Sequence, residues 1–487
     1  MVVGSLNMTD AAPYRKHIRH IRRCFVSVAS LLIVVFGSVP LLSAQPVHVS
    51  EHPDIQLFLD AGFQTQDRVD EALREISAVW KDSYASLVWD LAWLSRPPSR
   101  GFQRFFSLVG FLGEQTGQGV GADLDRWREW IWEQPYEPHP DYAYLKGQWY
   151  GQIDPRFRDF FPQGVTSRIR LDEIDWGGVT VNGIPPLYFP SINSAVEADY
   201  LADEDIVFGI ALNGEARAYP KRILAWHEMA VDELGGTELT IVYCTLCGTV
   251  IPFESEIQGR HFTFGTSGLL YRSNKLMFDE ETNSLWNKLG GEPVSGSLAE
   301  TGLRLTTRAV VTTTWGEWRR THRSTTVLSL DTGYNRDYSE GAAYRGYFGT
   351  DELMFPVNAS DTRLTNKEEI VTLRLRDTAQ QDRWIAVAIT AKFLQERPLH
   401  QQRIGEHELV IVTSDGGANR VYNAVDTKFV RKTEGAQLVD SEGRRWQIEE
   451  AALVLEKNSS IQRARVPAQR AFWFGGHAQF PDTVLID

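Results

Sequence analysis

The hydrophobic and polar positions divide the chain into two regions with different periods. In the first region apolar residues recur three or four positions apart, as at Val69, Leu73, Ile76 and Trp80, with charged residues between them. That spacing places the four side chains on one face of an α-helix. Two further helices are predicted on either side of the sequence RPPSRG, whose prolines and glycine break the pattern. The first region is therefore predicted to be helical.

A glycine-rich and tryptophan-rich stretch follows these helices. The sequence TGQGVGADLDRWREWIW resembles the closing motif of a HEAT-type repeat, in which Trp127 and Trp130 would cap the helical stack. A plain helical bundle that holds these aromatic side chains in its own core explains the pattern equally well. Both interpretations make residues 45–163 a helical domain.

The period changes at about Gly164. Short segments rich in Val, Ile, Thr and Phe, each bounded by Gly, Asn or Asp, predict a mainly β domain over residues 164–487. The fold class expected for the whole chain is thus α+β. Residues 235–254 also resemble residues 405–424, and each stretch follows a strand-like segment, which predicts an internal duplication of one β unit.

Composition narrows the function classes. A chain of 487 residues is too long for one ordinary core and reads as globular, with 43% hydrophobic and 23% charged residues. Its 50 Lys and Arg against 63 Asp and Glu give a formal charge of -13, which argues against a nucleic-acid partner. Three cysteines are too few for a disulfide-dense scaffold.

The N-terminus has the three-part layout of a secretory signal. A basic stretch at residues 15–23 runs into the apolar residues 25–42 and then into the small residues Ser43 and Ala44. We expect residues 1–44 to be a signal peptide and the protein to be exported, into the periplasm or outside the cell. The alternative is an uncleaved anchor that tethers the protein to the inner membrane.

Export makes the cysteine pattern informative. Cys24 falls within the predicted signal, so Cys244 and Cys247 are the thiols left in the exported chain. Cys244 ends an apolar strand-like segment, and Gly248 precedes another, so the pair is predicted to cap a β-hairpin. The CxxC of a thioredoxin-type site opens a helix, which Pro252 and the β-rich sequence disfavour here. Haem attachment is excluded because Gly248 stands where CxxCH requires histidine.

A hairpin with two sulfurs resembles half of a metal site. Tetrahedral thiolate centres need further ligands, and the nearest are His227, Glu228 and His261. A short helix would place Glu228 and Asp232 on one face. Thiolates with imidazole suit Zn or Cu ions.

Two other interpretations of the cysteine pair stay open. The dithiol can be redox-active and cycle with a disulfide, or it can be a permanent disulfide in a binding scaffold. A disulfide that closes a loop of about four residues would add only about 2 kcal/mol to the stability of the fold. His227 can also be a core histidine that makes only hydrogen bonds.

The cysteine motif also belongs to a family pattern. Its neighbours in this sequence are DWGGVTVNGIPPLYFP, GEARAYPKRILAWHEMAVDELGG, TIVYCTLCGTVIPF, FTFGTSGLLYRSNKLMFDEETNSLWNKLGGEPVSG, TTWGEWRRTHRSTTVLSLDTG and FWFGGHAQFPDTVLID. Together they resemble the bacterial family catalogued as domain of unknown function 3179. Its Tyr-Cys-x-x-Cys signature falls on Tyr243, Cys244 and Cys247, and its His-Glu pair on His227 and Glu228.

The sequence departs from this family pattern in one place. Asp279 and Glu280 stand where the family usually has Asp-Arg, with Arg272 and Lys275 just before. The resemblance implies a site around the cysteines and carries no assigned activity.

Several polar and aromatic residues follow the predicted hairpin. They are predicted to line a pocket around the thiols, although strand and core positions explain them as well; the residues are Tyr243, Ser267, Tyr271, Asn274, Ser284 and Trp286. No phosphate-binding GxxxxGK, nucleophile elbow or HExxH motif is present, so no nucleotide cofactor is expected.

Three functions therefore follow from the sequence. The first is an exported protein that binds Zn or Cu through Cys244, Cys247 and His227. The second is a thiol-disulfide oxidoreductase that uses the two cysteines. The third is a non-catalytic scaffold with an inert disulfide, and the partner in each case is a small molecule or another protein.

Overall fold

A computed structural model of the chain describes residues 52, 54–97, 101–358, 361–377, 379–380, 383–433 and 436–487. Residues Ser50–Asp487 form one compact unit. The predicted signal peptide, with Cys24, lies outside the described residues. Within the described part, no helix combines the length and apolar character needed to cross a membrane.

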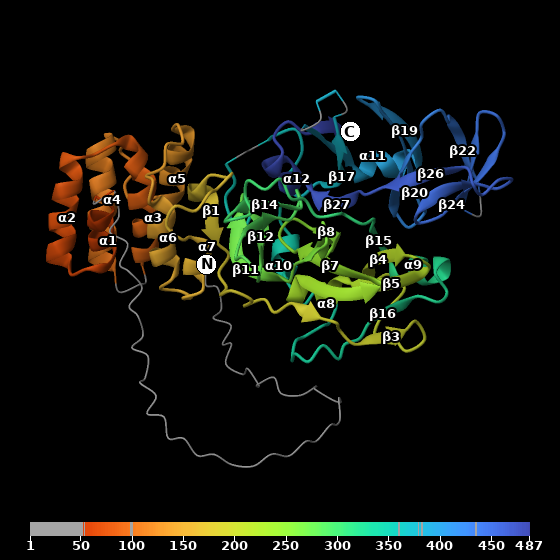
Figure 1. The fold of residues 1–487 in the computed structure, drawn as a ribbon, viewed down its shortest axis with the longest axis horizontal. Coiled ribbons are helices and arrows are strands. Elements are labelled where there is room, and N and C mark those ends of the chain that lie inside the picture. Colours follow the sequence, from red (N-terminus) through yellow and green to blue (C-terminus); the bar gives the residue numbers. More distant parts are fainter. Residues whose placement is uncertain are drawn as a thin grey trace, which may run out of the picture. The chain divides into compact units, whose positions relative to one another are not determined.

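Helices come first along the chain, and Figure 1 shows α1 to α6 gathered together in red to orange. Their bounds are α1 Ile55–Phe63, α2 Gln66–Ala78, α3 Ala85–Ser95, α4 Phe102–Thr116, α5 Leu124–Glu133, α6 Tyr142–Tyr150 and α7 Phe157–Phe160. The predicted apolar face of α2 is buried at Val69, Leu73 and Ile76. Trp80 lies beyond the end of α2, where its ring contacts Tyr84 and Phe111 edge to face.

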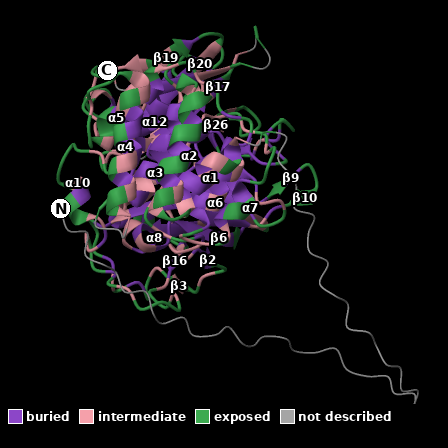
Figure 2. Ribbon diagram, turned by 90° about the vertical axis from the view of Figure 1, so that its left-hand side faces the viewer, coloured by how far each residue is buried: buried purple, intermediate pink, exposed green. Residues whose placement is uncertain are grey.

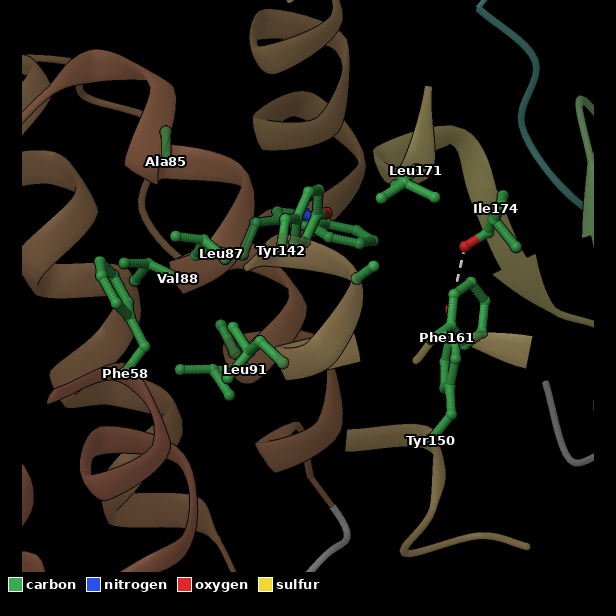
Figure 3. Packing of buried hydrophobic residues seen from close by; sticks show 14 of the residues in the cluster. Phe58, Ala85, Leu87, Val88, Leu91, Tyr142, Tyr150, Phe161, Leu171 and Ile174 are labelled. Atoms are coloured by element: carbon green, nitrogen blue, oxygen red, sulfur yellow. Dashed lines mark hydrogen bonds between the residues drawn. The ribbon is translucent and has the colours of Figure 1, made fainter. Parts of the chain in front are cut away.

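The helices share one hydrophobic core with the first sheet. Most of α3 is buried (Figure 2), and the cluster in Figure 3 runs from Phe58 in α1 to Ile174 in β1. The Tyr150 hydroxyl donates a hydrogen bond of 3.0 Å to the Ile174 carbonyl oxygen. Buried Arg128 of α5 pairs with Asp175 of β1 at 3.0 Å. The helical part is therefore packed tightly onto the β part.

That first sheet is antiparallel and has the order β1-β11-β12-β13-β14. Its strands are β1 Ile174–Trp176, β11 Phe264–Tyr271, β12 Asn274–Asp279, β13 Leu285–Asn287 and β14 Glu292–Ser295. A small hairpin, β9 Glu256–Ile257 with β10 Arg260–His261, precedes β11. The fold as a whole is α+β, with most strands in the C-terminal part.

A first β unit surrounds the cysteine motif. Its elements are β4 Ile206–Leu212, β5 Glu215–Pro220, α8 Lys221–His227, β6 Met229–Leu234, β7 Thr237–Cys244, β8 Thr249–Glu254, β15 Val311–Thr314, α9 Trp315–Thr321 and β16 Thr326–Leu328. They form the sheets β15-β4-β5-β16-β3 and β2-β6-β7-β8, to which β2 Leu187–Tyr188 and β3 Ile192–Ser194 add edges.

A second β unit has the same element order. Its elements are β17 Glu369–Arg376, β18 Trp384–Thr390, α11 Ala391–Glu396, β19 Leu399–Ile404, β20 His407–Thr413, β21 Asn419–Asn423, β27 Gln469–Phe472, α12 Trp473–Gln479 and β28 Val484–Ile486. The pairing also corresponds, because β27 is antiparallel to β17 as β15 is to β4, and β28 is parallel to β18 as β16 is to β5.

The second unit carries additional strands between β21 and β27. They are β22 Phe429–Thr433, β23 Gln437–Asp440, β24 Arg445–Ile448, β25 Ala452–Leu455 and β26 Gln462–Val466, and they extend the sheet that begins with β19. The connection from β16 to β17 contains the short helix α10 Arg345–Phe348. This connection covers the cysteine hairpin, as described below.

Candidate functional site

The two cysteines lie at the turn of the β7–β8 hairpin. Cys244 is the last residue of β7 and pairs with Thr249, the first residue of β8. The turn between them closes with Gly248 at a φ of 63°, a left-handed conformation that glycine adopts without steric cost. The predicted hairpin is confirmed, and a strand rather than a helix follows the motif.

Both thiols are free and buried. The exposed fraction is 2% for Cys244 and 0% for Cys247, and the Cys247 sulfur lies 3.9 Å from the Cys244 carbonyl oxygen. Leu246, Leu270 and Phe474 pack around them in one apolar cluster. The pair is thus not a disulfide in this structure, and both sulfurs are shielded from solvent.

Two buried lysines lie beside the thiols. The Lys275 ammonium pairs with the Glu228 carboxylate at 3.0 Å. Lys288 is fully buried and donates a 3.4 Å hydrogen bond to the Thr249 carbonyl oxygen, but it forms no ion pair with any described carboxylate. A buried ammonium without a counter-ion costs several kcal/mol. If both ammonium groups and the Glu228 carboxylate are charged, one ionised sulfur makes the cluster neutral.

The electrostatics assign that charge to Cys244. Burial alone would raise the pKa of the Cys244 thiol, but a hydrogen bond from Cys247 and the positive charge of Lys288 outweigh it and lower the pKa to about 6. Burial and the neighbouring Cys244 raise the pKa of Cys247 well above its ordinary value. At neutral pH the arrangement favours a Cys244 thiolate that accepts a hydrogen bond from the Cys247 thiol.

The connection from β16 to β17 covers the turn. The Tyr347 hydroxyl of α10 donates a 2.8 Å hydrogen bond to the Leu246 carbonyl oxygen between the cysteines. Burial raises the pKa of Tyr347, so its phenol keeps the donated proton. The Lys367 ammonium lies 3.5 Å from the centre of the Tyr347 ring and donates to the Tyr347 carbonyl oxygen. These contacts hold α10 over the thiols.

The second β unit completes the site. Strand β27 lies beside β8 (Figure 1), and its Phe472 amide donates a 2.9 Å hydrogen bond to the Cys247 carbonyl oxygen. A Cβ atom on Gly475 in α12 would lie 2.5 Å from the Cys247 Cβ atom. Glycine is therefore required here by close approach. The cysteine turn of the first unit is packed against β27 and α12 of the second unit.

His227 is directed away from the predicted ligand set. Its Nδ1 atom lies 2.9 Å from the Pro185 carbonyl oxygen and its Nε2 atom 2.6 Å from the Tyr338 hydroxyl. Burial lowers the pKa of His227 to about 4, so the ring is neutral. Nδ1 donates to Pro185 and Nε2 accepts from Tyr338, which leaves neither nitrogen free for a metal ion. His227 is a core histidine, the alternative that the sequence left open.

The other predicted ligands are also committed elsewhere. Glu228 pairs with Lys275, and half-exposed His261 lies 2.6 Å from Glu238. Across the described residues, no three or more His, Cys, Asp and Glu side chains are grouped so that they could hold a metal ion. The predicted metal centre of Cys244, Cys247, His227, Glu228 and His261 is therefore not assembled. The predicted short helix is also wrong beyond His227, because Glu228 is left-handed and Asp232 lies in β6.

One of the predicted pocket residues lies next to the thiol site. The Asn274 amide donates to the Gly475 carbonyl oxygen at 3.3 Å, and its own Oδ1 atom is buried without a hydrogen-bond partner. The Tyr243 ring points to the other side of β7, where it packs 5.0 Å from Phe208.

The four remaining pocket residues have structural partners. Ser267 donates to the Leu276 carbonyl oxygen, Tyr271 belongs to the core shared with the helices, Ser284 bonds with Thr282, and Trp286 donates to Asp279. Sequence reasoning missed Lys288, Tyr347, Phe472 and Gly475. Of these, Lys288, Phe472 and Gly475 carried a signal as members of the family stretches quoted above, and Tyr347 carried none.

A small cavity of about 50 Å³ lies beside the turn. Leu246, Glu228 and Lys275 line it together with Tyr344 and Phe355 of the covering connection. The larger opening, about 1110 Å³, lies elsewhere, around the β20–β21 turn of the second unit. Neither sulfur lines either space; Leu246, between the two cysteines, is the residue of the motif that borders the small cavity.

Comparison with known families gives one match. The family described as "Protein of unknown function (DUF3179)" matches residues 181–483, which is more than half of the chain. The chain belongs to the DUF3179 family. In this DUF3179 protein the match begins after helices α1 to α7, covers the first β unit, and covers the second β unit up to the residue before β28. No curated protein and no solved structure matches the chain.

Proposed function

We propose that this DUF3179 protein is a thiol oxidoreductase in which Cys244 is the attacking thiolate and Cys247 is the resolving thiol. One observation carries the proposal: buried Lys288 has no carboxylate partner among the described residues, while its positive charge acts on two free thiols and favours their ionised form. A thiolate is both the nucleophile of disulfide chemistry and the missing counter-ion. This is the second of the three functions that the sequence left open.

The reaction proposed is the two-electron oxidation of the pair. An oxidant takes two electrons from the Cys244 and Cys247 sulfurs, an S–S bond forms between them, and the thiol proton leaves. A reductant reverses the step. Forming the disulfide also removes the negative charge that balances Lys288, so the reduced state is the one that this buried ammonium stabilises.

A redox titration tests the proposal. The full-length chain is equilibrated with mixtures of reduced and oxidised dithiothreitol, the free thiols are alkylated, and the peptide with Cys244 and Cys247 is weighed by mass spectrometry, which separates it from Cys24. We expect one two-electron transition, absent in Cys244→Ser and in Cys247→Ser. A pair that stays fully reduced or fully oxidised at every potential would contradict the proposal.

The same sample also tests a reduced metal hypothesis, in which the two thiolates alone bind the ion. Two thiolates alone can hold Cu(I), which prefers soft sulfur ligands. Elemental analysis that finds one copper ion per chain, lost in both single-cysteine variants, would replace the redox proposal with a two-thiolate copper site. We expect no stoichiometric metal.

We also propose where the protein is located and how its two β units arose. We infer that the basic and apolar N-terminal sequence directs export, and N-terminal sequencing of protein from the periplasm checks cleavage near Ala44. We also infer that the two β units arose by duplication of one unit. Their shared element order and strand pairing support this inference.

A further inference from the structure

The buried thiols can exchange with a substrate disulfide only if one wall of their site moves. The exposed fraction is 2% for Cys244 and 0% for Cys247. In thiol-disulfide exchange the thiolate attacks the substrate sulfur directly, and a mixed disulfide joins the two molecules. The turn has two walls, the connection with α10 and the second β unit with β27 and α12. The way each wall is attached shows which one can move.

The wall from the second β unit is part of a sheet. Strand β27 pairs with β17 from Gln469 to Phe472, and the Phe472 amide is bonded to the Cys247 carbonyl oxygen. All seven residues of α12 are buried, and Gly475 has no room for a methyl group against Cys247. Moving this wall would break strand pairing and uncover a whole helix. The second unit is therefore the fixed wall.

The wall from the connection is attached more weakly. Of residues 341–350, which include α10, only Ala343 and Tyr347 are buried. Three of these ten residues are glycine, the residue that loses most conformational entropy when it is ordered. Segments with few buried contacts open locally at a small fraction of the free energy of global unfolding. Residues 341–350 are thus the wall that opens first.

The closed position of this wall is strained and latched. Tyr344, where α10 begins, has a φ of 58°, in the left-handed region that a bulky side chain occupies at an energetic cost. The Tyr347 hydroxyl bonded to the Leu246 carbonyl oxygen and the Lys367 ammonium over the Tyr347 ring hold the segment against that strain. Opening breaks the latch and releases the strained backbone.

The two walls hold different cysteines. Phe472 and Gly475 of the fixed wall contact Cys247. On the side of the connection, Tyr347 belongs to the same apolar cluster as both cysteines. Burial, then the charges of Glu228 and Cys244, raise the pKa of Tyr344, so its phenol lies within range of the charge on Cys244. Opening residues 341–350 therefore uncovers Cys244 and leaves Cys247 against the second unit.

We propose that residues 341–350 are a gate over the cysteine turn, that Tyr347 is its latch, and that the open gate presents Cys244 to a substrate disulfide while Cys247 stays covered. The inference rests on the proposed function and adds how its substrate reaches the site. The gate also explains how an attacking thiolate is kept from solvent between reactions.

The exchange in the open gate is balanced. The Cys244 thiolate attacks one sulfur of the substrate, an S–S bond forms between them, and the other substrate sulfur leaves as a thiolate. The Cys247 sulfur gives up its proton and attacks Cys244, which forms the internal disulfide and releases the second substrate sulfur. The dithiol is oxidised by two electrons and the substrate is reduced to two thiols, protonated by the Cys247 proton and one from water.

A single hydroxyl tests the latch. Tyr347→Phe keeps the ring and removes the donor to Leu246, so we expect iodoacetamide to modify Cys244 in the folded, reduced full-length chain about 3- to 10-fold faster. Mass spectrometry of the peptide locates the label. The control is Tyr150→Phe, which removes a hydroxyl that donates to the Ile174 carbonyl oxygen. It should leave the rate unchanged. Equal rates in Tyr347→Phe and the unaltered protein would overturn the latch.

Hydrogen exchange tests which wall moves. The amides of Ala342 and Phe348 are hydrogen-bonded in the closed gate. In Tyr347→Phe we expect their exchange to accelerate by the same factor as the alkylation, while the amides of β27 and α12 keep their protection. Exchange of β27 and α12 as fast as that of residues 341–350 would mean that the second unit is the wall that opens, and would contradict the gate.

A trapped intermediate tests the substrate, and the outcomes separate the gate from the proposed function. With oxidised glutathione, Cys247→Ser should accumulate a mixed disulfide on Cys244, and about 3- to 10-fold faster when Tyr347→Phe is added. A two-electron transition in dithiothreitol mixtures with no acceleration by Tyr347→Phe contradicts the gate and leaves the redox proposal standing. Faster alkylation without any transition contradicts the proposed function, and with it the disulfide substrate.

Discussion

The turns of the two corresponding hairpins have opposite surroundings. The β7–β8 turn carries Cys244 and Cys247 buried in an apolar cluster. The β20–β21 turn carries Ser414 and Gly417 at the corresponding positions and borders an open pocket of about 1110 Å³. Two hairpins in similar surroundings of strands thus carry a buried thiol pair in one place and border an open pocket in the other. The chemistry follows from the turn residues and from what covers them, not from the fold alone.

The partners of the two turns differ in the same way. Each turn packs against the helix that the other unit contributes: Cys247 lies against Gly475 of α12, and Ser414 donates a 2.9 Å hydrogen bond to Glu317 of α9. Near the second turn, Lys432 pairs with the Asp415 carboxylate at 3.3 Å. Within the described part of the chain, Lys288 near the first turn has no such partner. A buried lysine without a carboxylate partner there is what distinguishes the cysteine turn, and the proposed thiolate would supply its counter-ion.

The largest effect is expected from removing that lysine. In Lys288→Met the Cys244 thiolate loses its counter-ion, so its pKa rises, and we expect iodoacetamide to modify the pair about 100-fold more slowly at neutral pH. Lys288→Arg, which keeps the charge, should restore most of the rate. Lys432→Met is the matched control at the second turn and should leave the rate unchanged. Equal rates in Lys288→Met and the unaltered protein would remove the proposed role of the ammonium.

Two glycines without room for a methyl group provide a second comparison: Gly475 lies against the cysteine turn, and Gly416 belongs to the second turn. In Gly475→Ala the new methyl group meets the Cys247 Cβ atom, which belongs to a buried turn, and we expect a loss of about 1–3 kcal/mol in the free energy of unfolding. In Gly416→Ala it meets the carboxylate of Glu317, the flexible end of a side chain, and we expect less than about 1 kcal/mol. Urea denaturation measures both. The reverse order would show that the cysteine turn is not the rigid one.

The pH dependence of stability should come from Cys244 and not from the second turn. Folding lowers the pKa of Cys244 from its ordinary value of 9.0 to about 6, so between these values the unfolded chain binds a proton that the folded chain has released. The stabilisation is complete above pH 9 and is lost as the pH falls through 6. We expect the reduced protein to gain up to about 1.4 kcal/mol per pH unit in this window relative to Cys244→Ser. Parallel curves for the two proteins would contradict the assignment.

The smallest effect is expected at the second turn. Ser414→Ala removes the hydrogen bond to Glu317, and because that turn borders the open pocket, water from solvent can replace the lost donor. We expect a loss of at most about 1 kcal/mol in unfolding free energy and no change in the redox midpoint of the cysteines. A shifted midpoint would mean that the two turns are coupled.

The sequence predicted the local features of the site and missed the distant ones. Alternating apolar residues before Cys244 and after Gly248 were enough to place the hairpin, because strand pattern and turn are encoded in neighbouring residues. The direction of His227 was not encoded locally, since Glu228 adopts a left-handed conformation that ends α8 and turns the chain into β6. Phe472 and Gly475 reach Cys247 from the other β unit, through packing that no local pattern specifies.

The central claim is that reduced Cys244 is ionised at neutral pH as the counter-ion of Lys288. The thiolate absorbs in the ultraviolet where the thiol does not, so a pH titration of the reduced chain, with the curve of Cys244→Ser subtracted, reports its ionisation without any reagent having to enter the site. The account predicts a single transition centred near pH 6 with the amplitude of one thiolate. A difference curve that stays flat until about pH 8.5 or above, where an ordinary cysteine ionises, would contradict it.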